Sequence, residues 1–153
     1  MLVLLRTDGA FDRTHFVPGH FTASAFVLSP ERDALLLIFH KKLSLWLQPG
    51  GHVEPADETI LTAARREVRE EVGLSEFEMA GEDAALLDLD IHPIPARKDE
   101  PAHEHVAVRF LFQAGSRDFT ASDEVAGARW VRLSDLDAVT SDESVRRAAR
   151  KLG

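Results

Sequence analysis

The sequence predicts one α/β domain, because apolar extended segments and amphipathic helical segments alternate along it without an internal repeat. Alternation of this kind is typical of a sheet that is covered by helices. The chain has 153 residues, of which 44% are hydrophobic, so it can bury one substantial core but is short for two. We therefore expect residues 1–153 to form a single domain with a mixed sheet between helical layers.

Two neighbouring strands are expected early in the chain, after a first segment that fits either a short helix or an irregular arm. Residues 21–29 have a strand pattern, and residues 34–40 form a nearly continuous apolar run, which is typical of a strand buried on both faces. The polar residues between them predict a turn and hence a buried hairpin. The later elements are predicted as strands at 84–92, 103–112 and 127–133, and as helical segments at 133–139 and 143–152.

The composition excludes several classes of function. No cysteine is present, which rules out disulfides, thiolate metal sites and a cysteine nucleophile. The formal net charge of -8 disfavours a general nucleic-acid binder, because such proteins hold phosphates with lysine and arginine. No apolar run approaches the roughly 20 residues that span a bilayer, and the opening apolar stretch is too short for a secretory signal. We expect a cytoplasmic protein that has neither nucleic acid nor a membrane as a partner.

The most informative segment is an acidic helix, expected to begin after Asp57 as its N-cap and to end at Gly73. Its buried stripe is predicted at helical spacing and consists of Leu61, Ala64, Val68 and Val72. Another face gathers three carboxylates at positions i, i+3 and i+4, those of Glu67, Glu70 and Glu71. Because like charges at this spacing repel, either the neighbouring arginines or a hard divalent cation with oxygen ligands must neutralise them.

This segment resembles the Nudix box, whose pattern is a glycine, five residues, a glutamate, seven residues and then Arg-Glu-U-x-Glu-Glu-x-Gly-U, where U is a bulky aliphatic residue. Glu58 and the residues from Arg66 to Leu74 match this pattern in spacing. Gly51 departs from it, because six residues separate it from Glu58. The turn is therefore one residue longer than in the pattern, and the helix is unaffected.

The resemblance implies a Nudix α/β/α sandwich with a central mixed sheet, and it implies roles for particular residues. The metal ligands would be Glu67, Glu70 and Glu71, with the carbonyl of Gly51 as a further ligand. Arg66 would position these carboxylates through salt bridges, and Glu58 would support the same network. The implied cofactor is Mg²⁺, and Mn²⁺ suits the same oxygen ligands. Relatives of the MutT type use one more late carboxylate six residues before a tryptophan, a position held here by Glu124. Glu124 would be a further metal ligand or orient the water, and its neighbour Asp123 is the alternative.

Histidines form a second group of candidates, which we interpret as a polar pocket for phosphate or base edges of a substrate. Its members are His20, His52, His92, His103 and His105. His103 and His105 have strand spacing and point to one side, and His92 approaches them if the two later strands pair. A dedicated transition-metal site of histidine and aspartate is the weaker interpretation, because the spacing of these residues matches no zinc motif. Ordinary hydrogen-bonded histidines remain an alternative for each of them.

The function implied by the resemblance is metal-dependent hydrolysis of a phosphoanhydride bond in a nucleoside diphosphate derivative. A nucleoside triphosphate pyrophosphohydrolase is the leading interpretation. The alternatives are a hydrolase of sugar nucleotides or dinucleoside polyphosphates, and a nucleotide-sensing Nudix domain without catalysis. Isopentenyl diphosphate isomerases share the fold but rely on a cysteine that this chain lacks. The expected partner is a small nucleotide, and a homodimer stays open because dimers are common in the family.

Overall fold

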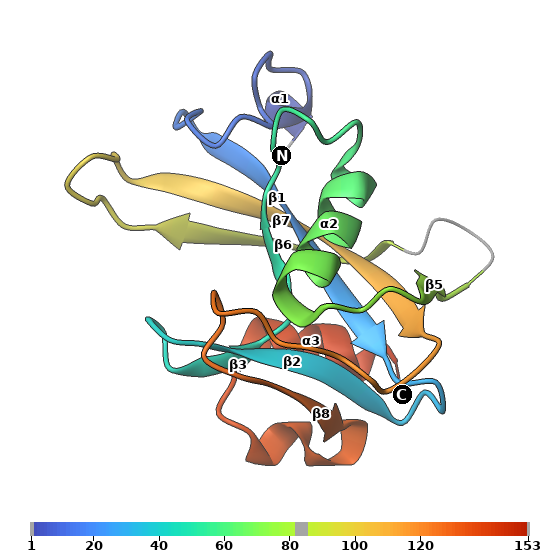
Figure 1. The fold of residues 1–153 in the computed structure, drawn as a ribbon. Coiled ribbons are helices and arrows are strands. Elements are labelled where there is room, and N and C mark those ends of the chain that lie inside the picture. The colour runs from blue at the N-terminus through green and yellow to red at the C-terminus, as the bar shows by residue number, and fades with distance from the viewer. Residues whose placement is uncertain (1, 82–85, 153) are drawn as a thin grey trace.

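The computed structural model describes residues 2–81 and 86–152, and it contains one mixed sheet with helices on both faces (Figure 1). The helices are α1 (Leu2–Leu5), α2 (Ile60–Val72), the 3-10 helix η1 (Leu133–Ala138) and α3 (Glu143–Arg150). The strands are β1 (Gly19–Leu28), β2 (Ala34–His40), β3 (Leu45–Leu47), β4 (Gly50–His52), β5 (Phe77–Met79), β6 (Leu86–Ile94), β7 (His103–Ala114) and β8 (Ala128–Arg132).

The parallel pair of β1 and β7 forms the centre of the sheet, in register from Gly19 opposite Glu104 to Leu28 opposite Gln113. The strand order is β3-β2-β1-β7-β5, with β4 paired to β1, β6 to β7 and β8 to β2. These other pairs are antiparallel, so the predicted mixed sheet is confirmed. Only the turn end of the predicted hairpin forms, because β2 pairs with β1 at Leu35 opposite Leu28 and then runs beside β8 and β3.

Two apolar layers cover the sheet, and the side chains of β1 alternate between them. Ala23, Ala25 and Val27 pack toward α2, whereas Phe26 and Leu28 pack in the layer that contains α3. Members of both layers have almost no exposed surface, which explains why strands 21–28 and 34–38 carry apolar residues on both faces. The predicted α/β/α sandwich is therefore confirmed.

Helix α2 begins two residues later than predicted. Thr59 is its N-cap and accepts a hydrogen bond from the backbone N–H of Thr62. Asp57, the expected cap, instead accepts hydrogen bonds from Arg66. A hydrogen bond between two charged groups is stronger than one to a backbone N–H, so Asp57 does not cap the helix. Gly73 ends the helix in the left-handed region, as predicted, with φ of 63°. No helix among the described residues is both long and apolar enough to cross a membrane.

Strand β6 has the predicted alternation, although residues 84 and 85 of the predicted strand lie outside the described residues. Its polar side is the buried one: Asp88 is 7% exposed, whereas Ile91 is 49% exposed. Asp88 accepts hydrogen bonds from Arg109 at 3.3 Å, from Arg147 at 2.6 Å and from Lys151 at 2.7 Å. Since two of these cations lie on α3 or directly after it, the buried carboxylate fastens α3 to the sheet.

Candidate active site

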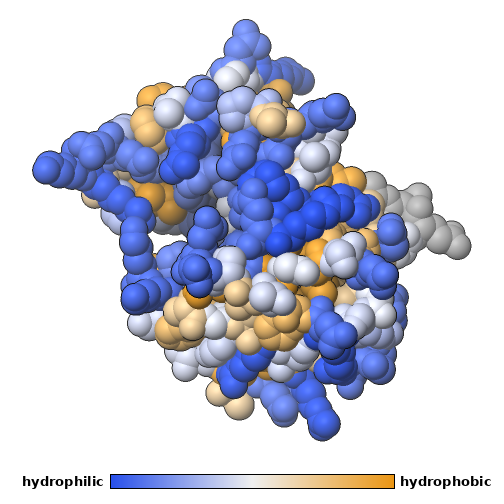
Figure 2. Space-filling model, in the orientation of Figure 1, coloured by the Kyte–Doolittle hydropathy of each residue, from blue (hydrophilic) through white to orange (hydrophobic). Residues whose placement is uncertain are grey.

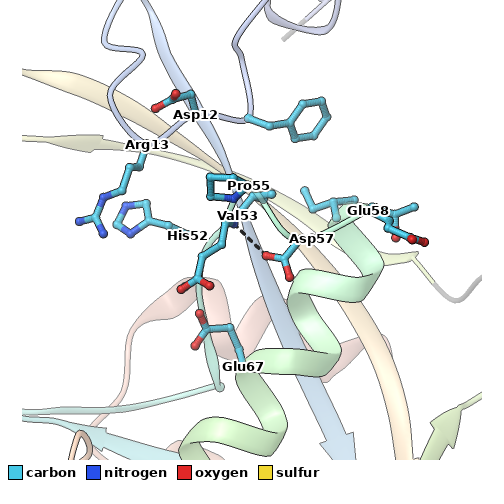
Figure 3. A pocket seen from close by; sticks show the side chains of 13 residues that line it. Asp12, Arg13, His52, Val53, Pro55, Asp57, Glu58 and Glu67 are labelled. Carbon is cyan, nitrogen blue, oxygen red and sulfur yellow. Dashed lines mark hydrogen bonds between the residues drawn. The ribbon is translucent and has the colours of Figure 1, made fainter.

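We call residues 2–18, which precede β1, the N-terminal arm. A cleft of about 640 Å³ lies between this arm, the segment after β4 and the first half of α2. It is lined by Phe11, Asp12, Arg13, Gly51, His52, Val53, Glu54, Pro55, Asp57, Glu58, Thr59, Ile60 and Glu67. Figure 3 shows Glu67 reaching up from α2 on one side, with Arg13 next to His52 on the other. Hydrophilic residues dominate the surface over α2 (Figure 2).

Two glycines bring the backbone of β4 against the carboxylates of α2. The N–H of Gly50 donates to Oε1 of Glu71 at 2.9 Å. A Cβ added to Gly51 would lie 2.5 Å from Oε1 of Glu67, so the approach of these two groups requires glycine. The two glycines of β4 thus bring its backbone directly against the acidic helix.

The carboxyl groups of Glu67 and Glu71 are held close together in surroundings with little water. Burial raises the pKa of Glu71 to about 8; the hydrogen bond from Gly50 opposes this, and the neighbouring Glu67 adds to it. Burial also raises the pKa of Glu67, against the opposing effect of Arg66. Two partly desolvated carboxyl groups side by side favour a site for a cation, because a positive charge would stabilise their ionised forms.

Arg66 lies at the centre of the charged network. Its guanidinium donates to Glu67 and Glu70, each at 3.0 Å, and to the carbonyl oxygen of His52 at 2.9 Å. It therefore joins the acidic helix to the end of β4. The hydrogen bonds that Arg66 donates to Asp57 raise the pKa of Arg66 well above its usual range, so the group is permanently charged.

Asp57, and not Glu58, binds the guanidinium of Arg66 with its carboxylate. Nε of Arg66 lies 3.0 Å from Oδ1 of Asp57, and Nη2 lies 2.9 Å from Oδ2. Among the described residues, Glu58 forms no hydrogen bond or ion pair, and it is exposed. The sequence carried a signal for this arrangement, because five residues separate Gly51 from Asp57, the spacing that the Nudix pattern requires.

Two further predicted ligands lie at the margin of the cluster. Glu70 is 49% exposed and pairs with Arg66. Glu124 lies on a loop that is anchored to the end of α2, where the N–H of Ser122 donates to the carbonyl oxygen of Glu71. Glu124 is exposed, yet its charge is near enough to contribute to the raised pKa of Glu71. The fold therefore brings Glu124 near Glu71, which its predicted role requires.

The five predicted histidines come together from four strands. His20 pairs with His105 across β1 and β7, and His92 pairs with His105 across β6 and β7. Ring centroids of neighbouring histidines are 4.7–5.4 Å apart. Among the residues that line the cleft, His52 is the one member of this group. Substrate contact by the other four stays a prediction.

These imidazoles differ in exposure and in charge. His20 and His103 are buried, whereas the side chain of His92 is 42% exposed and pairs with Asp90. Burial, followed by the charge of Arg13, lowers the pKa of His52 to about 4. Burial and the neighbouring histidines lower the pKa of His105 to about 3. Both rings are therefore neutral at physiological pH.

Arg13 also lies at the cleft, although the sequence does not mark it as a site residue. It comes from the N-terminal arm, where no periodic pattern or motif points to a site, and it lines the cleft opposite the carboxylates (Figure 3). The arm is held near β1 by the buried contacts of Leu4, Ala10 and Phe21. A guanidinium in this position can receive an anionic group that enters the cleft.

Comparison with known proteins gives the same family. A family model of the NUDIX domain matches residues 18–152. A Bacillus subtilis (strain 168) protein named "Putative 8-oxo-dGTP diphosphatase" is 32% identical over 113 residues, which cover 72% of this chain and 66% of that protein. A Lactococcus lactis subsp. cremoris (strain MG1363) protein named "Probable DHNTP pyrophosphohydrolase" is 35% identical over 94 residues, which cover 60% of this chain and 52% of that protein. This chain thus spans less than two thirds of the length of either relative.

A solved structure matches this fold over most of the length of both chains. The crystal structure of a NUDIX family hydrolase from Clostridium perfringens superposes with a TM-score of 0.70 at 24% identity, covering 87% of this chain and 95% of the other. The match to the family model extends over most of the chain and includes the acidic helix with its glycine turn. The chain therefore belongs to the NUDIX domain family, as its acidic helix predicted.

Proposed function

We propose that this protein is a metal-dependent hydrolase of a phosphoanhydride bond in a nucleoside diphosphate derivative. We further propose that its substrate is a nucleoside triphosphate, from which it releases pyrophosphate. The observation that carries the proposal is one cleft in which Glu67 and the Gly51 backbone face Arg13. Carboxylates that bind cations, opposed by a guanidinium, suit a polyphosphate that is held from two sides. The names of the two relatives, a diphosphatase and a pyrophosphohydrolase, agree with this choice.

The donor set fits a hard divalent cation, because every candidate ligand is an oxygen atom. We assign Glu67, Glu70, Glu71, Glu124 and the carbonyl of Gly51 to hold Mg²⁺, or Mn²⁺, which suits the same ligands. Such cations, when bound, neutralise phosphate oxygens and lower the pKa of an attacking water.

The remaining residues of the network position these ligands and the substrate. Arg66 holds the carboxylates of Glu67 and Glu70 by its hydrogen bonds, and Asp57 holds Arg66 in turn. We therefore transfer to Asp57 the supporting role that was expected for Glu58. Arg13 is assigned to phosphate oxygens, which a guanidinium can bind with two parallel hydrogen bonds.

The test is product analysis with the purified full chain, Mg²⁺ or Mn²⁺, and a panel of nucleoside triphosphates, a sugar nucleotide and a dinucleoside polyphosphate. Pyrophosphate and a nucleoside monophosphate from a triphosphate would support the proposal. A nucleoside monophosphate and a sugar phosphate as the main products would contradict the substrate assignment. Binding of nucleotides without any turnover would indicate the nucleotide-sensing alternative.

A matched pair of glutamate variants tests the site itself. Glu71→Gln should lower kcat by at least about 100-fold, because loss of a metal ligand or of a proton acceptor typically has this effect. The glutamine side chain can still accept the hydrogen bond from Gly50, so the melting temperature should change little. Glu78→Gln, on the exposed side of β5, is the control and should retain the full rate. A near-normal rate for Glu71→Gln would contradict the assignment.

A further inference from the structure

We propose that His20, His52 and His105 form a binding site for a transition-metal ion of the zinc class, separate from the carboxylates of α2. The three residues come from β1, β4 and β7. One ligand nitrogen from each ring lies within 4.8 Å of those from the other two. Among the described residues, this is the one group of three or more potential metal-ligating side chains that converges so closely.

The strand pairing explains how distant residues converge. His20 and His105 are direct partners in the parallel pair β1 and β7, and Thr22, two residues after His20 on the same face of β1, is the partner of His52. The separations along the chain, 20 to 52 and 52 to 105, match no sequence motif for zinc. The site therefore exists only after the sheet has formed, so the lack of a zinc motif in the sequence does not exclude it.

His20 supplies an independent indication that a ligand belongs here. Its side chain is 1% exposed, and its Nδ1 lies 3.1 Å from the carbonyl oxygen of His15, so Nδ1 carries the proton and donates. Its Nε2 is then a lone-pair acceptor, and it is buried without a hydrogen-bond partner. A buried acceptor without a partner is unfavourable. A metal ion at this nitrogen would remove that deficit.

The surroundings of the rings resemble the support that metal-binding histidines usually have. Such histidines commonly donate their other N–H group to a backbone carbonyl, as His20 does to His15. His103 donates in the same way to the carbonyl oxygen of Pro101 at 2.9 Å. The Nε2 of His103 therefore accepts from the Nε2 of His105 at 3.3 Å, which holds the His105 ring in place.

The ligand chemistry separates this site from the acidic one. Imidazole nitrogens suit Zn²⁺, Cu²⁺, Fe²⁺ and Ni²⁺, whereas Mg²⁺ takes oxygen ligands. Three histidines leave a fourth coordination position for water or another ligand, as in catalytic zinc sites. Because His52 also lines the cleft, an ion bound here would adjoin the space assigned to the substrate.

The test uses Co²⁺ and Zn²⁺ as probes on the full chain after treatment with a chelator. Co²⁺ should bind with the visible absorption of a tetrahedral or five-coordinate site, and Zn²⁺ should displace it while excess Mg²⁺ should not. His105→Gln should weaken Co²⁺ binding by at least about 100-fold, since loss of a mere supporting partner already costs 10- to 100-fold. The ring of His105 is only partly buried, so this variant is expected to fold.

Two controls make the result decisive. His40→Gln replaces a histidine outside the cluster, whose ring accepts the N–H of Leu43, and it should leave Co²⁺ affinity unchanged. Glu71→Gln should also leave it unchanged, which separates this site from the proposed hydrolase centre. The absence of Co²⁺ binding by the wild-type chain would overturn the proposal. Binding that is lost in Glu71→Gln but kept in His105→Gln would overturn it equally, because the ion would then lie on the carboxylates.

Discussion

Replacing Asp57 by asparagine tests the charged network around Arg66, and Glu58→Gln is its matched control. Both changes neutralise one acid at neighbouring positions of the same loop. Asp57 has a side chain that is 3% exposed and receives hydrogen bonds from Nε and Nη2 of Arg66, at 2.9–3.3 Å. Glu58 is exposed. We therefore expect Asp57→Asn to impair activity and Glu58→Gln to have little effect.

The size of the effect follows from the contacts that remain. Arg66 keeps its hydrogen bonds to Glu67, Glu70 and the His52 carbonyl when Asp57 is neutralised. The loss should therefore be smaller than the roughly 3–5 kcal/mol typical of a buried ion pair that loses one partner entirely. Groups that hold metal ligands in place typically contribute 10- to 100-fold in affinity or activity. This range corresponds to about 1.4–2.7 kcal/mol.

The assay compares kcat/KM and Mn²⁺ affinity of the two variants with those of the wild-type chain. Asp57→Asn should lower kcat/KM about 10- to 100-fold and weaken Mn²⁺ binding, with a change of less than about threefold for Glu58→Gln. Thermal unfolding of both variants checks that the fold persists. If Glu58→Gln lost as much activity as Asp57→Asn, the role assigned to Asp57 would be wrong.

Three further predictions concern the glycine turn, the late loop and the buried carboxylate of β6. Gly51→Ala should lower kcat with little change in melting temperature, because the added Cβ would displace the flexible end of the Glu67 side chain. Gly50→Ala should instead lower the melting temperature, because the added Cβ would lie 2.6 Å from the backbone oxygen of Ala23 in β1. Glu124→Gln should lower kcat about tenfold or more, and an unchanged rate would remove this residue from the site. Asp88→Ala should destabilise the fold by about 3–5 kcal/mol, or roughly 6–20 °C in melting temperature. The reason is that the change removes a carboxylate partner of the buried guanidinium of Arg109. Burial opposes ionisation of Asp88, but the hydrogen bonds from Arg147 and Lys151 outweigh this effect and keep the pKa of Asp88 below 3.8. The stability that the ionised Asp88 contributes is therefore present above pH 3.8, and it is lost as the pH falls through the lowered pKa of Asp88 in the folded protein.

The elements with a local pattern were predictable from the sequence. The face of α2 that carries Glu67 and Glu71 follows from helical spacing, and the Gly73 stop follows from the preference of glycine for the left-handed region. The helix start was less certain, because both Asp57 and Thr59 are good caps. The choice between them depended on Arg66, which lies nine residues beyond Asp57 and competes for its carboxylate.

The sequence alone thus determined the family, the acidic helix and the face on which its carboxylates gather, because a 3.6-residue repeat and a fixed motif spacing depend on neighbouring positions. Only the tertiary structure decided that Arg13 faces the carboxylates, that Asp88 is buried on β6 and that three histidines converge on one point. These contacts join residues tens of positions apart, and they depend on which strands pair and in which register. No local pattern in the chain encodes that choice, because it is made by the packing of the whole sheet.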